Sequence, residues 1–203
     1  MPKQTFLNLS TEKQHNLLKA AKQEFSRVPL HEAVISNIIK SAQISRGSFY
    51  QYFEDLEDLF FYLLEEHVKK NREQFIVHLR QNKGDLINTF IDVFQSMLKD
   101  FQDENHRIFF RNAFLNMNHK VSNAFTNNTS LENLVNQRTD FLSIIDTAKL
   151  NIKDERELLH TMKIIQAITF QNLVQSFAMQ LSTEEAIENY TLEMSMIKKG
   201  LYY

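Results

Sequence analysis

The chain lacks cysteine and tryptophan, and it has only three glycines and two prolines among 203 residues. Without cysteine, neither a disulfide scaffold nor a thiolate metal site can form, and a reducing cytoplasm is compatible with the composition. The scarcity of glycine and proline argues against a turn-rich all-β fold and favours a nearly all-helical one. No run of about 18 apolar residues predicts a membrane span. Residues 1–6 also lack the apolar core of a signal peptide.

The charges are unevenly distributed along the chain. Residues 1–53 carry seven basic and three acidic residues, a net charge of +4, while residues 54–203 carry sixteen basic and twenty-two acidic residues, a net charge of −6. A basic segment joined to an acidic one is typical of a nucleic-acid-binding head on a body that does not bind nucleic acid. Chance scatter of surface charge gives the same numbers, so this observation needs a motif beside it.

Three short helices are predicted in the basic segment. The first covers 11–27, because Thr11 and Gln14 have the spacing of a capping box, apolar residues follow at helical intervals, and Pro29 ends the run. The second covers 32–41. A third is predicted from an N-cap at Ser45 to about residue 53.

Longer helices are predicted in the remainder. Asp55 is a suitable N-cap for a helix over 56–81, Gly84 marks a break, and Ser182 or Thr183 caps a last helix that ends near residue 200. Between these lie predicted helices over 85–101, 104–117, 121–150 (a break at 126–129 stays open) and 154–181. The expected fold is therefore all-α with about nine helices: a helix-turn-helix domain over 1–53 and a larger helical domain over 54–203.

Residues 44–53, ISRGSFYQYF, have the composition of a helix that reads the major groove of DNA. Arg46 can bond bidentately to guanine, Gln51 can read adenine, and Gly47 lets the backbone approach a phosphate closely. Serine and tyrosine hydroxyls suit phosphate contacts, whereas Phe49 and Phe53 are expected in the core. The candidate DNA contacts are Ser36, Ser45, Arg46, Gly47, Ser48, Tyr50, Gln51 and Tyr52.

This pattern resembles the TetR (AcrR-type) family of bacterial transcriptional regulators. The resemblance covers about residues 11–64 and rests on Ile38, Ala42, the run 44–50, Tyr52-Phe53 and Asp58-Leu59. It implies a DNA-binding head on a body that binds a ligand and forms a homodimer in the cytoplasm, with no membrane partner. Two heads would occupy a pseudo-palindromic operator on double-stranded DNA, and a small-molecule effector would release them, which makes the chain a repressor.

Two positions depart from the family pattern. Gln43 stands where the turn often has glycine, which costs on the order of 1 kcal/mol if the backbone there is left-handed. Leu56 stands where a lysine often meets a phosphate, and four acidic residues surround it. Fewer phosphate contacts and a shallower salt dependence of DNA binding are therefore expected.

The body offers candidates for a dimer interface and for an effector pocket. The segment around 158–181 is apolar on more than one face, so it needs two partners; burial within a larger monomer is the other interpretation. The interface candidates are Met162, Ile165, Leu173, Phe177, Ile187, Tyr190, Met194 and Ile197. Phenylalanines could line a pocket for a small hydrophobic or aromatic effector; the candidates are Phe90, Phe94, Phe110, Phe114, Phe141 and Phe170.

No obligatory cofactor, metal site or catalytic constellation is predicted. The histidines of the body lack metal-ligand spacing, although haem, which some members of the family sense, stays open as an effector. Two alternatives remain: a haem or small-molecule binding protein without specific DNA binding, which the acidic residues around Leu56 favour, and an enzyme with an unrecognised active site.

Overall fold

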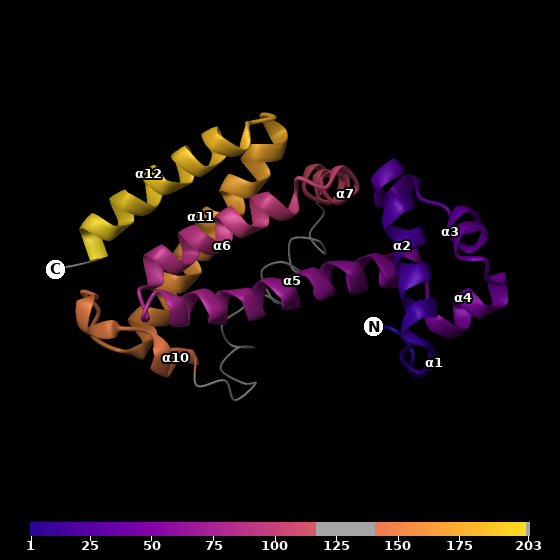
Figure 1. The fold of residues 1–203 in the computed structure, drawn as a ribbon, viewed down its shortest axis with the longest axis horizontal. Coiled ribbons are helices and arrows are strands. Elements are labelled where there is room, and N and C mark those ends of the chain that lie inside the picture. Colours follow the sequence, from indigo (N-terminus) through magenta and orange to yellow (C-terminus); the bar gives the residue numbers. More distant parts are fainter. Residues whose placement is uncertain (117–140, 202–203) are drawn as a thin grey trace. The chain divides into compact units, whose positions relative to one another are not determined.

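The computed structural model describes residues 1–116 and 141–201, and every regular element in these ranges is a helix (Figure 1). The all-α fold class is thereby confirmed. The α-helices are α1 (Gln4–Leu7), α2 (Thr11–Arg27), α3 (Ile35–Ala42), α4 (Arg46–Tyr52), α5 (Leu56–Gln81), α6 (Leu86–Asp100), α7 (Glu104–Leu115), α10 (Phe141–Ile144), α11 (Glu155–Ala178) and α12 (Thr183–Leu201). Two short 3-10 helices, η1 (Leu30–Glu32) and η2 (Thr147–Lys149), complete the described elements.

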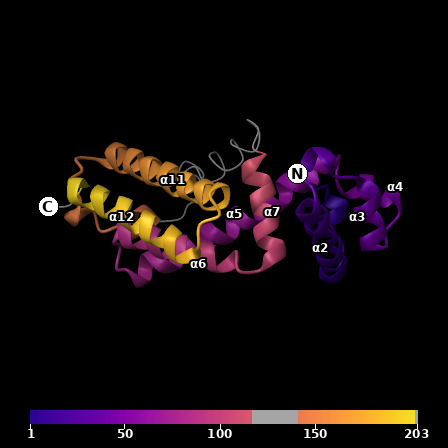
Figure 2. The same ribbon diagram turned by 90° about the horizontal axis from the view of Figure 1, so that it is seen from above.

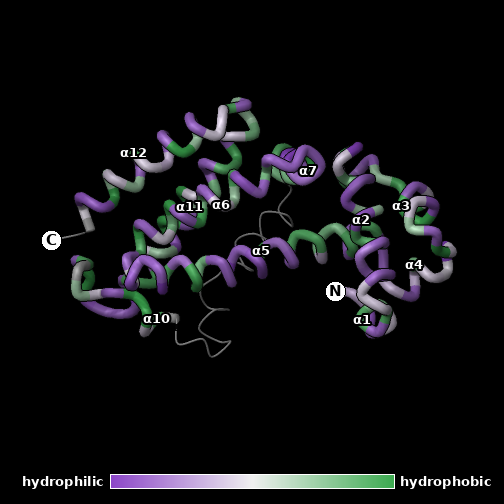
Figure 3. Tube along the Cα trace, viewed as in Figure 1, coloured by the Kyte–Doolittle hydropathy of each residue, from purple (hydrophilic) through white to green (hydrophobic). Residues whose placement is uncertain are grey.

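The helices form two compact units. The first contains α1 to α4, the first half of α5 up to Val68, and α7; the second contains the rest of α5, α6, α10, α11 and α12. The hydropathy of α5 follows this division, because a mainly hydrophobic first half precedes a hydrophilic central stretch (Figure 3).

Aromatic side chains fill the core of the first unit. The ring of Phe25 on α2 lies 5.1 Å from that of Phe60 on α5, and Phe60 lies 5.6 Å from Phe109 on α7. Phe49 and Phe53, at the inner face and the end of α4, are fully buried, as the sequence predicts. Burial of these rings holds the short helices together, since a helix of seven or eight residues is marginal by itself.

Several predicted helix starts are confirmed by side-chain caps. The amide of Ser48 donates to Oγ of Ser45 at 3.0 Å, and the amide of Asp58 donates to Asp55 at 2.8 Å. Ser182, rather than Thr183, caps α12, because the amide of Glu185 donates to its hydroxyl at 3.1 Å. Each cap satisfies an amide that has no partner within its helix.

The predicted capping box at the start of α2 is wrong. The N-cap of α2 is Ser10, and its side chain makes no cap hydrogen bond. The side-chain amide of Gln14 instead reaches back and donates to three carbonyls, those of Phe6, Leu7 and Leu9, at 3.1–3.2 Å. A tertiary contact has therefore taken the residue that local spacing assigned to the cap.

The second predicted helix begins later than residue 32. The 3-10 helix η1 occupies Leu30–Glu32, and α3 begins at Ile35 with Val34 as its N-cap. Val34 is 44% exposed. The amide of Val34 donates a hydrogen bond to the buried carboxylate of Glu24 on α2, and this bond fixes where α3 can start.

In the second unit, α6, α11 and α12 pack around a stack of two rings. Phe94 and Tyr190 lie with their centroids 4.1 Å apart, and the hydroxyls of Tyr190 and Thr169 are 2.6 Å apart. Figure 2 shows α11 and α12 as neighbours along this core. The Tyr190 hydroxyl is buried, and burial raises its pKa far above the ordinary value, so it stays neutral.

The predicted helix over 121–150 does not continue to its end. Residues 117–140 lie outside the described part, and the remainder consists of α10, ending at Ile144, followed by η2 and an extended Leu150. The segment after α10 is hydrogen-bonded to the turn at Gly84. Gly84 has a φ of 82°, and its carbonyl accepts a hydrogen bond from the amide of Asp146 at 3.0 Å.

Most of the predicted dimer-interface side chains lie in the chain's own core. The buried ones are Met162, Ile165, Leu173, Phe177, Tyr190 and Met194, whereas Ile187 and Ile197 are half-buried. A side chain that its own chain already covers adds little area to a contact with a second chain. Other residues of α11 and α12 face outward instead: Ile164 is 59% exposed, Leu192 62% and Met196 64%, and Met179, the C-cap residue of α11, is 68% exposed.

Candidate nucleic-acid interface

A tight turn joins α3 to α4. Gln43 adopts the left-handed backbone with φ 54° and ψ 43°, and the amide of Ile44 donates to the carbonyl of Ile39 at 3.0 Å. This is the ending that glycine usually provides, because a side chain costs about 1 kcal/mol there. The turn nevertheless forms, and with it the helix-turn-helix that the sequence predicts.

The outer face of α4 carries the predicted DNA contacts. Ser45, Arg46, Gly47, Tyr50 and Gln51 are exposed. The opposite face is formed by the buried Phe49. A row of donors and acceptors on one side of a short helix, with an apolar anchor on the other, is the arrangement of a helix that enters the major groove.

Arg46 and Tyr50 lie one turn apart and contact each other. A guanidinium nitrogen of Arg46 lies 3.5 Å from the Tyr50 hydroxyl, and the guanidinium carbon lies 5.9 Å from the centre of the ring. The hydrogen bond is long and both side chains are exposed, so the pair is weak. The guanidinium therefore remains available for a bidentate contact with a guanine edge.

Gly47 is not required by packing. A Cβ atom at this position would find only the hydroxyl oxygen of Ser45, at 3.7 Å, which is ordinary contact distance. The space in front of Gly47 is open, which leaves its backbone accessible to a phosphate.

The remaining predicted contacts are less uniform. Ser36 is exposed on the first turn of α3. Ser48 is half-buried, and its hydroxyl lies 2.8 Å from that of Ser45. Tyr52 is half-buried as well, with its ring centre 6.4 Å from that of Phe6. Part of the Tyr52 ring thus belongs to the core of the first unit.

A buried carboxylate, which the sequence reasoning did not identify, ties α2 to α3. Glu24 is 5% exposed and accepts hydrogen bonds from Arg27 at 2.8 and 3.0 Å, from the amide of Val34 at 3.0 Å, and from the side chain of Asn37. The Arg27 hydrogen bond, with smaller contributions from Val34 and Asn37, lowers the pKa of the Glu24 carboxyl to about 2 against the opposing effect of burial. The signal available in the sequence was an acidic residue between Ala21 and Phe25 on an apolar face.

The acidic residues around Leu56 are used partly for capping. Asp55 accepts from the amide of Asp58, and Asp58 accepts from the amide of Glu54 at 3.1 Å. Capping lets these carboxylates stabilise the start of α5.

The predicted pocket phenylalanines are divided between the two units. Phe110 and Phe114 belong to the first unit, where Phe110 packs against His67 and His106 with ring centres 4.2 and 5.0 Å apart. Phe90, Phe94 and Phe170 belong to the second. The side chain of Phe141 lies outside the described part.

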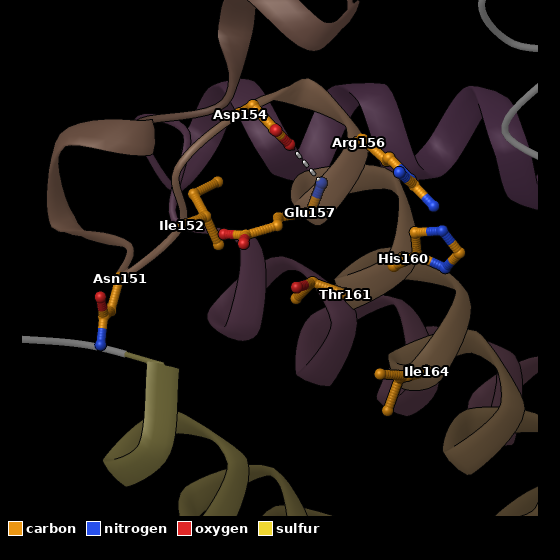
Figure 4. A pocket seen from close by; sticks show the side chains of 8 residues that line it. All are labelled: Asn151, Ile152, Asp154, Arg156, Glu157, His160, Thr161 and Ile164. Atoms are coloured by element: carbon orange, nitrogen blue, oxygen red, sulfur yellow. Dashed lines mark hydrogen bonds between the residues drawn. The ribbon is translucent and has the colours of Figure 1, made fainter.

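A shallow pocket of ≈ 410 Å³ lies at the start of α11 (Figure 4). It is lined by Asn151, Ile152, Asp154, Arg156, Glu157, His160, Thr161 and Ile164. Asp154 caps α11 by accepting from the amide of Glu157 at 2.8 Å. None of the phenylalanines predicted for an effector pocket contributes to it.

Family models and a relative match the chain over both parts. The model described as "Bacterial regulatory proteins, tetR family" matches residues 17–63, which include α3 and α4. The model described as "Tetracyclin repressor-like, C-terminal domain" matches residues 85–201, more than half of the chain. The uncharacterized HTH-type transcriptional regulator YdgC of Bacillus subtilis is 32% identical over 108 residues, which are 52% of this chain and 55% of YdgC. The chain thus spans about half the length of this curated relative.

Solved structures share the fold at low sequence identity. SmeT, the repressor of the Stenotrophomonas maltophilia multidrug efflux pump SmeDEF, superposes with a TM-score of 0.69 at 13% identity over 98% of this chain and 93% of SmeT. A protein of Syntrophomonas wolfei gives 0.68 at 19% identity, over 92% of this chain and 95% of that one. A TetR-family transcriptional regulator of Streptomyces coelicolor gives 0.63 at 17% identity, over 93% and 81%.

None of the described helices combines the length and the apolar character that a bilayer crossing requires. The matched segments include both the helix-turn-helix and the helices that follow it, and the fold agrees with them. The chain belongs to the TetR family of bacterial transcriptional regulators.

Proposed function

We propose that this regulator is a homodimeric repressor that binds a pseudo-palindromic operator through α4 and leaves it when a small apolar or aromatic effector binds. The observation that carries the proposal is the exposed row of Arg46, Tyr50 and Gln51 over the buried Phe49. Such a row presents a guanine-reading and an adenine-reading side chain to base edges, with a hydroxyl between them. Acting on DNA in this way requires a location in the bacterial cytoplasm.

The proposed contacts divide into two groups. Arg46 and Gln51 are assigned to base edges, because both are long, exposed and able to bond bidentately. The hydroxyls of Ser36, Ser45, Ser48, Tyr50 and Tyr52 and the backbone at Gly47 are assigned to phosphates. The first group sets sequence preference, while the second sets position on the duplex.

The proposed homodimer rests on the outward apolar residues of α11 and α12. Leu192 and Met196 lie one turn apart on α12, and both are more than 60% exposed. Exposed apolar side chains on neighbouring helices mark a contact surface. Two subunits joined there would bring two heads to half-sites about one helical turn, roughly 34–36 Å, apart.

Repression and effector release are the finer parts of the proposal. SmeT, which shares the fold, is described as a repressor of a multidrug efflux pump. If the effector and the operator favour different states of the dimer, each must weaken the binding of the other by the same factor. The proposed contacts of the effector are Phe90, Phe94 and Phe170 in the second unit. Phe110 and Phe114 of the first unit and Phe141 are the other proposed contacts. Haem is one candidate effector.

Selection of bound duplexes from a random DNA pool by the purified protein tests the proposal. Enrichment of a palindrome whose half-sites are about one turn apart supports a dimeric reader. If no sequence is enriched, even after the protein has been refolded from denaturant to remove any bound ligand, the helix-turn-helix does not recognise a specific DNA sequence. The alternative of a small-molecule binding protein without specific DNA binding would then be favoured.

A further inference from the structure

The C-terminal end of α4, the proposed recognition helix, is hydrogen-bonded to a segment near the start of the chain. α4 has only seven residues, and the carbonyls of its last turn cannot find partners inside the helix. The carbonyls of Tyr50, Gln51 and Tyr52 instead accept hydrogen bonds from residues before α2. The Lys3 ammonium donates to the carbonyl of Tyr50 at 2.8 Å, the Thr5 hydroxyl donates to that of Gln51, and the Lys3 amide donates to that of Tyr52 at 2.8 Å.

An aromatic anchor fixes the same segment in the core. Phe6 is fully buried, and its ring centre lies 4.9 Å from that of Phe53 and 5.5 Å from that of Tyr62. Phe53 is the C-cap residue of α4, and Tyr62 lies on α5. The segment therefore sits at the point where the recognition helix ends and α5 follows.

The other end of the segment is fixed to α2. The side-chain amide of Gln14 donates to the carbonyls of Phe6, Leu7 and Leu9, which follow or end α1. Residues 3–9, called the brace below, are thus bonded to α4 on one side and to α2 on the other. A four-residue helix such as α1 has no stability of its own, so these contacts are what order it.

We propose that the brace positions the recognition helix for DNA reading, with Lys3 and Thr5 as its positioning residues; this inference rests on the proposed DNA-binding function. The carbonyls that the brace holds belong to Tyr50, Gln51 and Tyr52, three of the proposed DNA contacts. Without these bonds the last turn of α4 frays, and the side chains of that turn lose their fixed direction toward the groove. Loss of one such bond weakens operator binding about fivefold.

A different role for Lys3 predicts a different result. If the ammonium contacts a phosphate, its removal weakens binding to all DNA sequences alike. The slope of the logarithm of the binding constant against the logarithm of the salt concentration then becomes shallower by about one. A positioning residue lowers the preference for the operator, while binding to scrambled DNA and its salt dependence stay unchanged. Thr5 separates the two roles most cleanly, because Thr5→Val removes a donor without changing charge or size.

The test combines amide hydrogen exchange of the free protein with DNA binding. Thr5→Val and Lys3→Gln are compared with Thr11→Val and Lys13→Gln, which make the same changes at exposed positions on α2. The brace predicts that amide exchange at the end of α4, residues 51–53, becomes about fivefold faster in the first pair only, with exchange in α3 unchanged. It also predicts about a fivefold loss of preference for the operator over scrambled DNA in that pair.

Unchanged exchange in α4 overturns the proposal, and so does a uniform loss of binding to all DNA with a shallower salt dependence in Lys3→Gln. A wild-type protein without any sequence preference contradicts the proposed function itself, and the brace then has no role in reading. Because the exchange measurement needs no DNA, the two failures are distinguishable.

Discussion

In the proposed function, some side chains of the helix-turn-helix contact DNA and others hold its helices in place. Arg46 is exposed and weakly bound to Tyr50, so its guanidinium is free to turn toward a base. Glu24 is the opposite case: it is buried, and it accepts hydrogen bonds from Arg27 and from the amide of Val34. The chemistry of each residue predicts a different consequence when it is changed.

Replacement of Arg46 by alanine should cost about 1–3 kcal/mol of operator binding and relax the preference at one base pair. The reason is that a bidentate contact with guanine discriminates by that amount. Competition binding with a set of singly substituted operators measures both effects. The control is Lys69→Ala, which removes one exposed positive charge from the second half of α5. Equal weakening on every sequence would show that Arg46 contacts only a phosphate.

Replacement of Glu24 by glutamine should lower the free energy of unfolding at neutral pH by about 3–4 kcal/mol. The folded-state pKa of about 2 lies below the ordinary value of 4.5, and each unit corresponds to about 1.4 kcal/mol. A lowered pKa contributes stability above pH 4.5, and this contribution disappears as the pH falls toward 2.

Urea denaturation of the wild type and the Glu24→Gln variant between pH 7 and pH 2 measures this difference. It should shrink steadily below about pH 4.5. The exposed Glu12→Gln on the same helix should show no such difference. A stability difference that is independent of pH would mean that the ionised form of Glu24 is not what ties α2 to α3.

At the scale of helices, the sequence predicts those whose signals are local. α2 has the predicted limits of 11–27, because its periodic apolar residues are followed by a proline. α5 has the predicted limits of 56–81, because an Asp N-cap precedes its periodic apolar residues. Ser45 likewise predicts the start of α4. α1 could not be predicted, because four residues hold no periodicity and Gln14 and Phe6 order them through tertiary contacts.

The late start of α3 has a similar cause. Periodicity extends the helix back to residue 32, but the Glu24 carboxylate takes the amide of Val34 and fixes it as the N-cap. In the same way, the exposed face of α4 follows from residue types, whereas the hydrogen bonds from Lys3 and Thr5 that hold this helix join residues more than forty positions apart. Spacing in a single sequence does not reveal such pairs.

The turn after α5 gives a prediction about backbone conformation. A Cβ at Gly84 would lie 2.4 Å from the carbonyl oxygen of Ile144 and 2.5 Å from the amide of Asp146, at a φ of 82°. Gly84→Ala should therefore lower the free energy of unfolding by more than about 2 kcal/mol, because both the contacts and the backbone are strained.

Gly200→Ala is the matched control, since a Cβ there meets nothing within 4 Å and alanine favours the helix by up to about 1 kcal/mol. Thermal unfolding of both variants measures the contrast. If Gly84→Ala is as stable as the wild type, the contact between residues 84 and 146 does not exist in solution.

At the scale of the whole molecule, the proposed function needs two copies of the chain. Tyr190 and Met194 are buried, so the most exposed large apolar residues that α12 offers to a partner are Leu192 and Met196. Leu192→Glu and Met196→Glu should each weaken dimerisation at least tenfold, because a carboxylate would be buried without a partner.

Sedimentation at a series of concentrations measures the dimerisation. Val77→Glu, at a position 53% exposed on α5, is the control and should leave it unchanged. If both α12 variants dissociate at the same protein concentration as the wild type, the subunits meet through another surface.

The central claim is that α4 reads a DNA sequence, and the ratio of two affinities tests it most directly. The wild-type protein would be titrated at about 0.15 M salt with the duplex enriched from the random pool and with a scrambled duplex of the same composition. Specific readers commonly prefer their site by about a thousandfold or more, and that is the ratio expected here. A ratio below about ten would show that the exposed face of α4 binds DNA without reading it, and would contradict the account.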